Sequence, residues 1–160
     1  MEEDLKKWLK NAKKIAVLGI GNVYRKDDGV GSLTIQKLEE YSLPENVKLF
    51  NCETVPENFT YAVRSFNPTH IILVDSALLN QKPGTVKLVS PEKIGGITVS
   101  THTLPLTFLV KYFEEFIGAK TVLVAIQPKN VDFGFGLTFE VEKTLKNLVK
   151  VLVRIFKNYG

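Results

Sequence analysis

The sequence has little of several features that would assign a protein to a class at once. Its 160 residues include one cysteine, Cys52, so no internal disulfide can form, which fits a reducing compartment. No apolar run approaches the roughly 18 residues that a membrane-spanning helix needs. The first ten residues are charged throughout, unlike a secretory signal. We therefore expect a cytoplasmic protein without a membrane segment.

Basic blocks, internal repeats and low-complexity linkers are also missing. The formal charge of +4 comes from scattered lysines and only three arginines. Lysine dispersed among glutamate is typical of a solvated surface, so we expect no nucleic-acid partner. A chain of this length can bury about two-thirds of its unfolded surface in one domain. We expect a single domain over residues 1–160, working as a monomer or weak dimer.

What the sequence does contain is an alternation of short apolar runs with amphipathic segments. Strands are predicted at residues 14–19, 47–52, 71–74, 85–89 and 121–126. Helices are predicted at residues 1–12, from Val30 to about Tyr41, after a capping box at Thr54–Glu57, over 106–117 and from about Thr138.

This order of elements predicts the fold class. Strands that alternate with helices form an α/β protein, here a three-layer α/β/α sandwich with a mostly parallel (mixed) sheet of about five strands. The run at residues 85–89 follows a Pro83-Gly84 turn rather than a helix, so it is the strand expected to run antiparallel.

The most distinctive segment joins the first strand to the next helix. Residues 19–31 read G-I-G-N-V-Y-R-K-D-D-G-V-G. A glycine-rich turn in this place often binds a dinucleotide, but Tyr24 occupies the position of the third glycine in that fingerprint. Asp27 and Asp28 would also repel a phosphate at the helix N-terminus. The loop therefore favours a cation over a nucleotide.

Two further polar side chains are predicted to lie near this acidic loop. Asp75 directly follows the buried run at residues 71–74, and His102 precedes the helix over 106–117. Ligands of open α/β sheets bind at the carboxyl ends of the strands, where all three segments would meet. Asp28, Asp75 and His102 then form a plausible three-ligand site for a divalent ion.

Each of these residues also has a purely structural interpretation. Asp28 could cap the following helix, Asp75 could be a turn residue, and His102 could be a hydrogen-bonded structural histidine. His70, before its strand, is expected at the surface on the opposite edge of the sheet. Cys52 is expected to be a buried apolar residue outside the site.

At these residues the chain resembles the hydrogenase maturation endopeptidases, which trim the C-terminal tail of the large subunit of nickel–iron hydrogenases. The resemblance covers nearly all of the chain after residue 12. Its motifs are G-x-G-N at 19–22, D-D-G-x-G at 27–31, L-V-D-S-A at 73–77, P-G at 83–84, T-H-x-x-P at 101–105 and I-Q-P at 126–128. Residues 56–58, P-E-N, resemble the branch that serves energy-converting and formate-linked hydrogenases. One departure is Arg25-Lys26, where relatives often carry a small or apolar residue.

The resemblance implies an activity and a set of roles. The nickel ligands of the family match Asp28, Asp75 and His102, and the nickel is supplied by the precursor rather than held permanently. The implied partner is the large-subunit precursor, and the ion would deliver one peptide bond for cleavage. Asp28 and Asp27 are the candidates for the catalytic base that activates water.

Two other hypotheses remain open from the sequence. A non-catalytic nickel-binding maturation factor, which checks insertion without cutting, would need the same ligands. A nucleotide-binding domain is disfavoured by Tyr24 and by the acidic pair. Nickel-dependent processing by an endopeptidase is the leading prediction.

Overall fold

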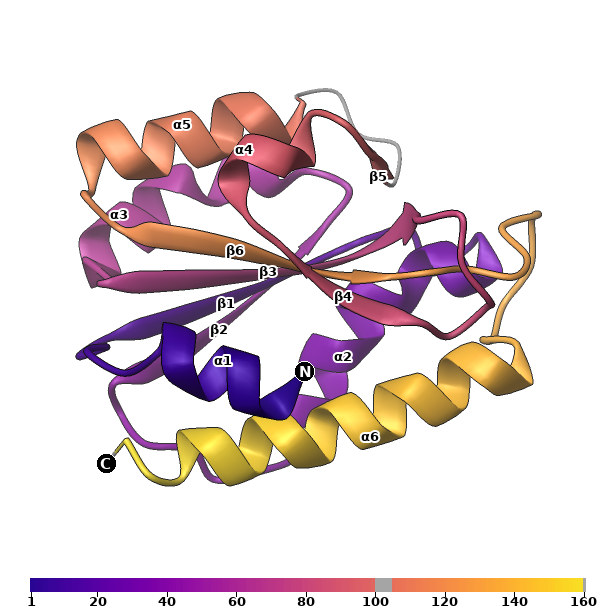
Figure 1. Ribbon diagram of the computed structural model, residues 1–160, viewed down its shortest axis with the longest axis horizontal. Coiled ribbons are helices and arrows are strands. Elements are labelled where there is room, and N and C mark those ends of the chain that lie inside the picture. Colours follow the sequence, from indigo (N-terminus) through magenta and orange to yellow (C-terminus); the bar gives the residue numbers. More distant parts are fainter. Residues whose placement is uncertain (100–104, 160) are drawn as a thin grey trace.

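The computed structural model describes residues 1–99 and 105–159, in which strands and helices alternate along the chain (Figure 1). In chain order the elements are α1 (Glu2–Trp8), β1 (Ile15–Ile20), the 3-10 helix η1 (Lys26–Gly29), α2 (Val30–Leu38), β2 (Val47–Glu53), the 3-10 helix η2 (Pro56–Phe59), α3 (Thr60–Phe66), β3 (His70–Leu78), β4 (Val86–Val89), α4 (Pro91–Ile94), β5 (Thr98–Val99), α5 (Leu106–Phe116), β6 (Lys120–Ile126) and α6 (Phe139–Phe156). In these two ranges no helix is both long and apolar enough to cross a membrane.

The strands form one mixed sheet in the order β2-β1-β3-β6-β4, and the two-residue β5 pairs with the end of β3. Strands β2, β1, β3 and β6 run parallel, whereas β4 is antiparallel to β6. The mostly parallel sheet and the antiparallel strand after the Pro-Gly turn are therefore confirmed. Strand β5 adds one short strand to the five expected.

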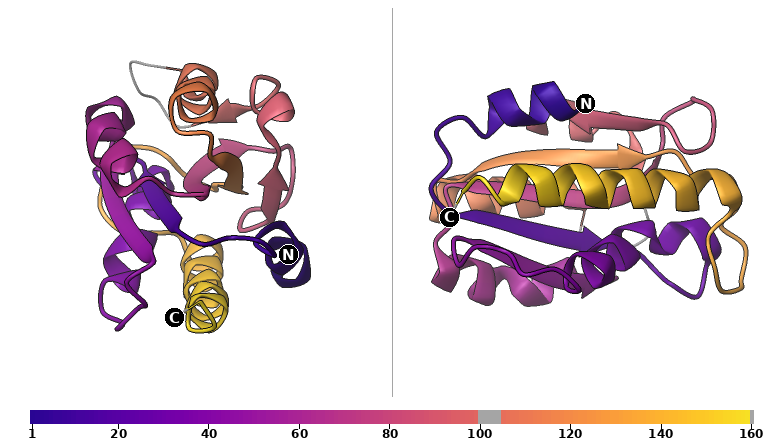
Figure 2. Two further views of the ribbon diagram at one scale, coloured as in Figure 1. Left: turned by 90° about the vertical axis from the view of Figure 1, so that its left-hand side faces the viewer. Right: turned by 90° about the horizontal axis from the view of Figure 1, so that it is seen from below.

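Helices cover both faces of the sheet, as the end-on view in Figure 2 shows. Helices α1, α2 and α6 pack against one face, and α3, α4 and α5 pack against the other. A strand with both faces covered must be apolar on both sides, which explains the uninterrupted apolar runs of β1 and β6. The three-layer α/β/α prediction is confirmed.

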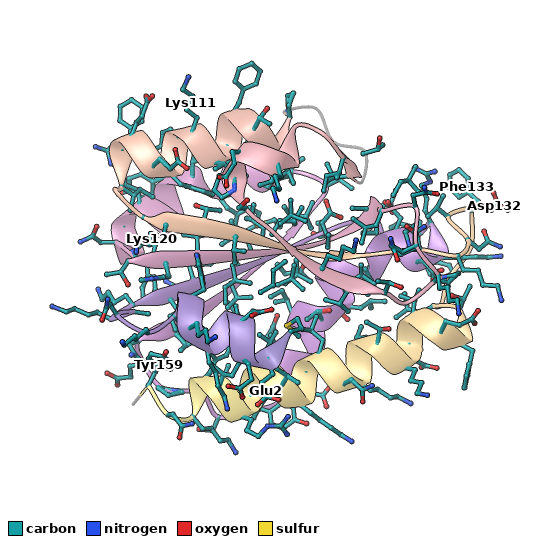
Figure 3. The ribbon with its side chains drawn as sticks, viewed as in Figure 1. Glu2, Lys111, Lys120, Asp132, Phe133 and Tyr159 are labelled. Atoms are coloured by element: carbon teal, nitrogen blue, oxygen red, sulfur yellow. The ribbon has the colours of Figure 1, made fainter. Side chains whose placement is uncertain are left out.

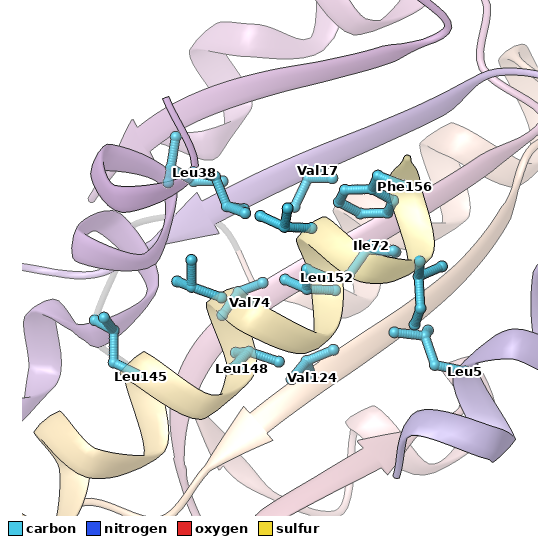
Figure 4. Close-up of a cluster of buried hydrophobic side chains, with 14 of the residues drawn as sticks. Leu5, Val17, Leu38, Ile72, Val74, Val124, Leu145, Leu148, Leu152 and Phe156 are labelled. Carbon is cyan, nitrogen blue, oxygen red and sulfur yellow. The ribbon is translucent and has the colours of Figure 1, made fainter. Parts of the chain in front are cut away.

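The core on the α6 side is drawn in Figure 4. Leu148 and Leu152 of α6 lie against Val17 of β1 and against Ile72 and Val74 of β3. Burial of each such side chain stabilises the fold by roughly 1.5–3 kcal/mol relative to exposure. Apolar residues at helical spacing along α6 therefore bind this long helix to the sheet.

The N-terminal helix is shorter than predicted, because α1 spans Glu2–Trp8 rather than residues 1–12. Its Leu5 side chain is fully buried in the core shared with α6. The Arg154 guanidinium donates to both oxygens of Glu2, at 2.8 and 3.1 Å, and the Tyr159 hydroxyl donates to the Leu9 carbonyl at 2.7 Å. Glu2 and Tyr159 are labelled in Figure 3. Helix α1 is thus fastened to α6.

Two local predictions were wrong. His70 is only 4% exposed, because the Trp8 ring of α1 covers it edge-on at 4.9 Å between centroids. The sequence places Trp8 far from His70, so this cover could not be anticipated. The capping box at Thr54–Glu57 does not form either, since η2 begins after Val55 and no side chain caps it.

Candidate functional site

The acidic loop is held at the carboxyl ends of β1 and β3 by close packing of glycine. A side chain at Gly31, in the first turn of α2, would clash with the carbonyl oxygens of Ile20 and Val74. A side chain at Gly19 would clash with the Gly31 carbonyl. Both positions accept only glycine at this distance between α2 and the sheet. Helix α2 therefore lies directly on the sheet, and η1, which precedes it, lies at the carboxyl-terminal ends of the strands.

Asp28 lies in η1 and is only 4% exposed. One carboxylate oxygen accepts the backbone N–H of Asn22 at 3.2 Å, and the other accepts the Ser76 hydroxyl at 3.3 Å. Helix α2 is preceded by Gly29 and has no side-chain cap. The capping role considered for Asp28 is therefore absent, and the carboxylate instead faces the end of β3.

Asp27, its neighbour, is fully buried and turned toward a different segment. Its carboxylate accepts backbone N–H groups of Lys129, Asn130 and Thr138 at 2.9, 3.0 and 2.8 Å. It also accepts the Thr138 hydroxyl at 2.7 Å. These four hydrogen bonds fix the segment between β6 and α6 against the acidic loop.

The prediction that Asp75 follows its strand was wrong, because β3 continues to Leu78; Asp75 is fully buried within β3 and pairs in register with Ala125 of β6. Side chains alternate along a strand. Ser76 therefore points to the α2 face, where it meets Asp28, and Asp75 points to the face that α3 and α5 cover. The two acids lie on opposite faces of the sheet near the carboxyl-terminal end of β3. A ligand that contacts both must therefore sit at the carboxyl-terminal ends of the strands.

His102, the third predicted ligand, lies outside the described residues. Val99, the last described residue before it, pairs with Ala77, two positions beyond Asp75 on β3. Within residues 1–99 and 105–159, no three His, Cys, Asp or Glu side chains are grouped as a metal site would require. The three-ligand site thus stays a prediction.

A pocket of about 140 Å³ opens beside Asp28. It is lined by Arg25, Asp28, Ser76, Ala77, Leu78, Thr98, Val99, Pro128 and Val131. Typical small-molecule sites measure roughly 300–1,000 Å³, so this pocket suits a few atoms rather than a whole nucleotide. An ion and one peptide group are of the right size.

Cys52 lies outside this pocket, in the core between β2 and α3. Burial, reinforced by the negative charge of Glu57, raises the pKa of the Cys52 thiol to about 12. A thiol that stays protonated is a poor nucleophile and a poor metal ligand. The prediction that Cys52 is buried in the apolar core is confirmed.

The sequence analysis assigned no role to Ser76, Arg25 or Gln127, although each lies in a segment that it singled out. Ser76 directly follows Asp75. Because side chains alternate along a strand, the sequence could have predicted that Ser76 points to the face opposite Asp75, toward the acidic loop. The Arg25 guanidinium donates to the Val131 carbonyl at 3.1 Å, across 106 positions of sequence. The Gln127 carboxamide accepts the Leu79 N–H at 2.7 Å and so fixes the turn that follows β3. No local signal identifies either long-range contact.

Comparison with known proteins identifies relatives along nearly the whole chain. The family model of hydrogenase maturation proteases matches residues 33–155. A Methanocaldococcus jannaschii protein assigned to the hydrogenase maturation proteases is 39% identical over 164 residues, covering 98% of this chain and 96% of its own. The hydrogenase 3 maturation protease of Escherichia coli is 28% identical over 138 residues, covering 85% of this chain and 86% of its own.

Solved structures give the same picture. The crystal structure of the NiFe hydrogenase maturation protease HycI from Thermococcus kodakarensis superposes with a TM-score of 0.90 at 28% identity. The match covers 97% of this chain and 99% of that one. The two chains therefore share one fold over nearly the whole length of each.

Proposed function

Because this chain belongs to the hydrogenase maturation protease family and is a hydrogenase maturation endopeptidase, we propose that it removes the C-terminal extension of a NiFe hydrogenase large-subunit precursor after nickel insertion. Nickel already bound in the precursor is the signal for cleavage. The proposed ligands from this chain are Asp28, Asp75 and His102.

The observation that carries the proposal is the placement of Asp28. Its carboxylate is buried, lines the small pocket and accepts two hydrogen bonds. An ionised carboxylate has about four acceptor positions, and residues 1–99 and 105–159 fill two of them, which leaves room for a ligand. A buried negative charge is costly unless a cation or further donors compensate it. Carboxylate and imidazole together form a fitting donor set for a borderline divalent ion.

The proposed mechanism uses the ion in the precursor to position one peptide bond. Holding the carbonyl group beside the attacking water makes a bimolecular step effectively unimolecular. The ion of the precursor would polarise the carbonyl oxygen. Asp28 and Asp27 remain the candidates for the group that takes a proton from the water. Asp28 is the stronger candidate, because the four hydrogen bonds that Asp27 accepts from the described residues all come from the segment at residues 129–138.

Family membership favours this proposal over a non-catalytic nickel-binding factor. We also propose a cytoplasmic location, because the single buried thiol of Cys52 fits a reducing compartment. For the oligomeric state we propose a monomer or weak dimer.

One experiment tests the central claim. The protein is mixed with nickel-loaded and with nickel-free precursor, and the mass of the large subunit is followed with time. The expected result is loss of the tail from the loaded precursor only. Equal cleavage of both precursors would show that nickel is not recognised, and binding without any loss of mass would favour the non-catalytic factor.

A further inference from the structure

The segment between β6 and α6 exposes aromatic side chains next to the candidate site. Phe133, Phe135 and Phe139 are 86%, 76% and 75% exposed. Figure 3 shows Phe133 projecting from the outer end of this segment, beside Asp132. Single exposed apolar residues are common on protein surfaces, but here Phe133 and Phe135 of the loop and Phe139, the first residue of α6, lie within seven residues and form a concentrated apolar patch. With Tyr24 they are called here the aromatic loop surface.

This surface is held in place rather than loosely attached. Asp27 binds the segment at both ends, through Lys129 and Thr138. Between them the Gly134 N–H donates to the Tyr24 carbonyl at 2.9 Å, and the Lys26 N–H donates to the Gly134 carbonyl at 3.0 Å. The segment is therefore ordered before any partner binds, which lowers the entropy lost on association.

Local geometry turns the aromatic rings outward. Gly134 and Gly136 have φ of +144° and +91°, a conformation that residues with a side chain rarely adopt. They alternate with Phe133 and Phe135, so the chain bends at each glycine. The Phe135 ring contacts the Tyr24 ring edge-on at 5.2 Å, which joins the two loops into one surface.

The aromatic loop surface is continuous with the pocket at Asp28. Arg25 and Val131 both line that pocket and are joined by the 3.1 Å hydrogen bond between them. Tyr24 is the neighbour of Arg25, and Phe133 lies two residues after Val131. A polypeptide whose peptide bond enters the pocket on the side of Arg25 and Val131 would therefore lie within reach of these rings.

We propose that the aromatic loop surface is a docking surface for the large-subunit precursor and binds an apolar segment of it next to the scissile bond. This inference rests on the function proposed above, since it requires that the pocket at Asp28 receives the precursor. The occupant is the precursor rather than a second copy of this chain because the surface is continuous with that pocket. Exposed aromatic rings that become buried are common binding hot spots.

The test compares two variants with the unchanged protein on nickel-loaded precursor. Phe133→Ser/Phe135→Ser removes the two most exposed rings of the surface. Tyr61→Ser is the matched control, because Tyr61 is 81% exposed on α3 and lines no part of the pocket. For the double variant we expect KM to rise at least about tenfold, with kcat within about twofold and an unchanged melting temperature. The control should match the unchanged protein.

Binding of the precursor to immobilised protein provides a readout that does not depend on cleavage. The double variant should bind at least about tenfold more weakly than the control. An unchanged KM and unchanged binding, with normal cleavage by the unchanged protein, would overturn the docking surface and leave the proposed function intact. Failure of the unchanged protein to cleave would instead contradict the proposed function.

Sedimentation distinguishes the other possible occupant. The proposal expects the unchanged protein and the double variant to have the same oligomeric state. A dimer that the double substitution dissociates would assign the rings to self-association and overturn the proposal.

Discussion

At the scale of single residues, two adjacent aspartates with the same chemistry have different surroundings. Asp27 accepts four hydrogen bonds from the segment at residues 129–138, whereas Asp28 accepts two and faces the pocket. Adjacent residues in the tight turns of η1 point in different directions, so one acid holds the loops together and its neighbour faces the proposed substrate.

The first prediction exchanges each acid for its amide. In Asp27→Asn, an NH₂ group replaces an acceptor that faces backbone N–H donors, so we expect the free energy of unfolding to fall by about 1–3 kcal/mol. In Asp28→Asn, the remaining oxygen can still accept from Asn22 and the Ser76 hydroxyl can reorient. We expect a change in stability within about 1 kcal/mol and loss of tail removal. Thermal melts and the mass assay measure the two effects.

The contrast between the variants is the informative result. Full activity of Asp28→Asn would contradict its role as a ligand or base. Asp75→Asn and His102→Gln extend the comparison, because each keeps a polar group of similar size and removes the proposed nickel ligand. Both are expected to fold normally and to leave the nickel-loaded precursor uncut.

The second prediction concerns His70 and pH. Burial, together with the positive charge of Lys120, lowers the pKa of His70 and outweighs a contact with the Trp8 backbone that raises it. The folded protein therefore binds a proton at His70 less readily than the unfolded chain does. The contribution of the neutral His70 imidazole to stability is present above about pH 6.5, and it is lost as the pH falls below that value. The melting temperature should decrease as the pH falls below about 6.5.

A matched variant isolates this contribution. His70→Gln cannot take up a proton, so the part of the pH dependence that depends on His70 should disappear from its melting curves. An identical slope in both proteins would assign the pH dependence to other groups.

At the scale of elements, regular segments could be predicted from the sequence and long-range contacts could not. The apolar runs of β1, β3 and β6 are local signals of strands buried on both faces. Asp75 and the acidic loop lie near the carboxyl-terminal ends of their strands. Because these strands are parallel, those ends lie on the same side of the sheet. The role of Asp27 depends on Lys129 and Thr138, more than 100 residues away, and no local pattern records that contact.

The third prediction tests how closely α2 must lie on the sheet. Gly31→Ala adds a methyl group that would clash with the carbonyl oxygens of Ile20 and Val74. We expect the free energy of unfolding to fall by about 1–3 kcal/mol and processing to decrease, because α2 shifts and moves Asp28. Gly95→Ala is the control, since its nearest neighbour is the Thr107 methyl group at 3.6 Å. Equal melting temperatures for the two variants would contradict the close-packing argument.

At the scale of the whole molecule, the two ends of the chain support each other on one face of the sheet. Helix α1 contacts α6 through the buried Leu5 and through the ion pair of Glu2 with Arg154. Trp8 packs on His70, the first residue of β3, whereas the proposed site lies near the end of that strand. The N-terminal helix therefore supports the fold near the amino-terminal end of β3, whereas the proposed site lies near the carboxyl-terminal end.

The last prediction follows from this separation. Leu5→Ala removes a fully buried side chain and should lower the free energy of unfolding by about 2–5 kcal/mol. Glu2→Gln weakens only a solvent-exposed ion pair, so the melting temperature should change far less than in Leu5→Ala. Well below the melting temperature of each variant, both should process nickel-loaded precursor at the rate of the unchanged protein, because the residues described as lining the pocket include none of α1. A loss of rate in Leu5→Ala without loss of folded protein would show that α1 takes part in the reaction, and would place the two ends of β3 in one functional unit.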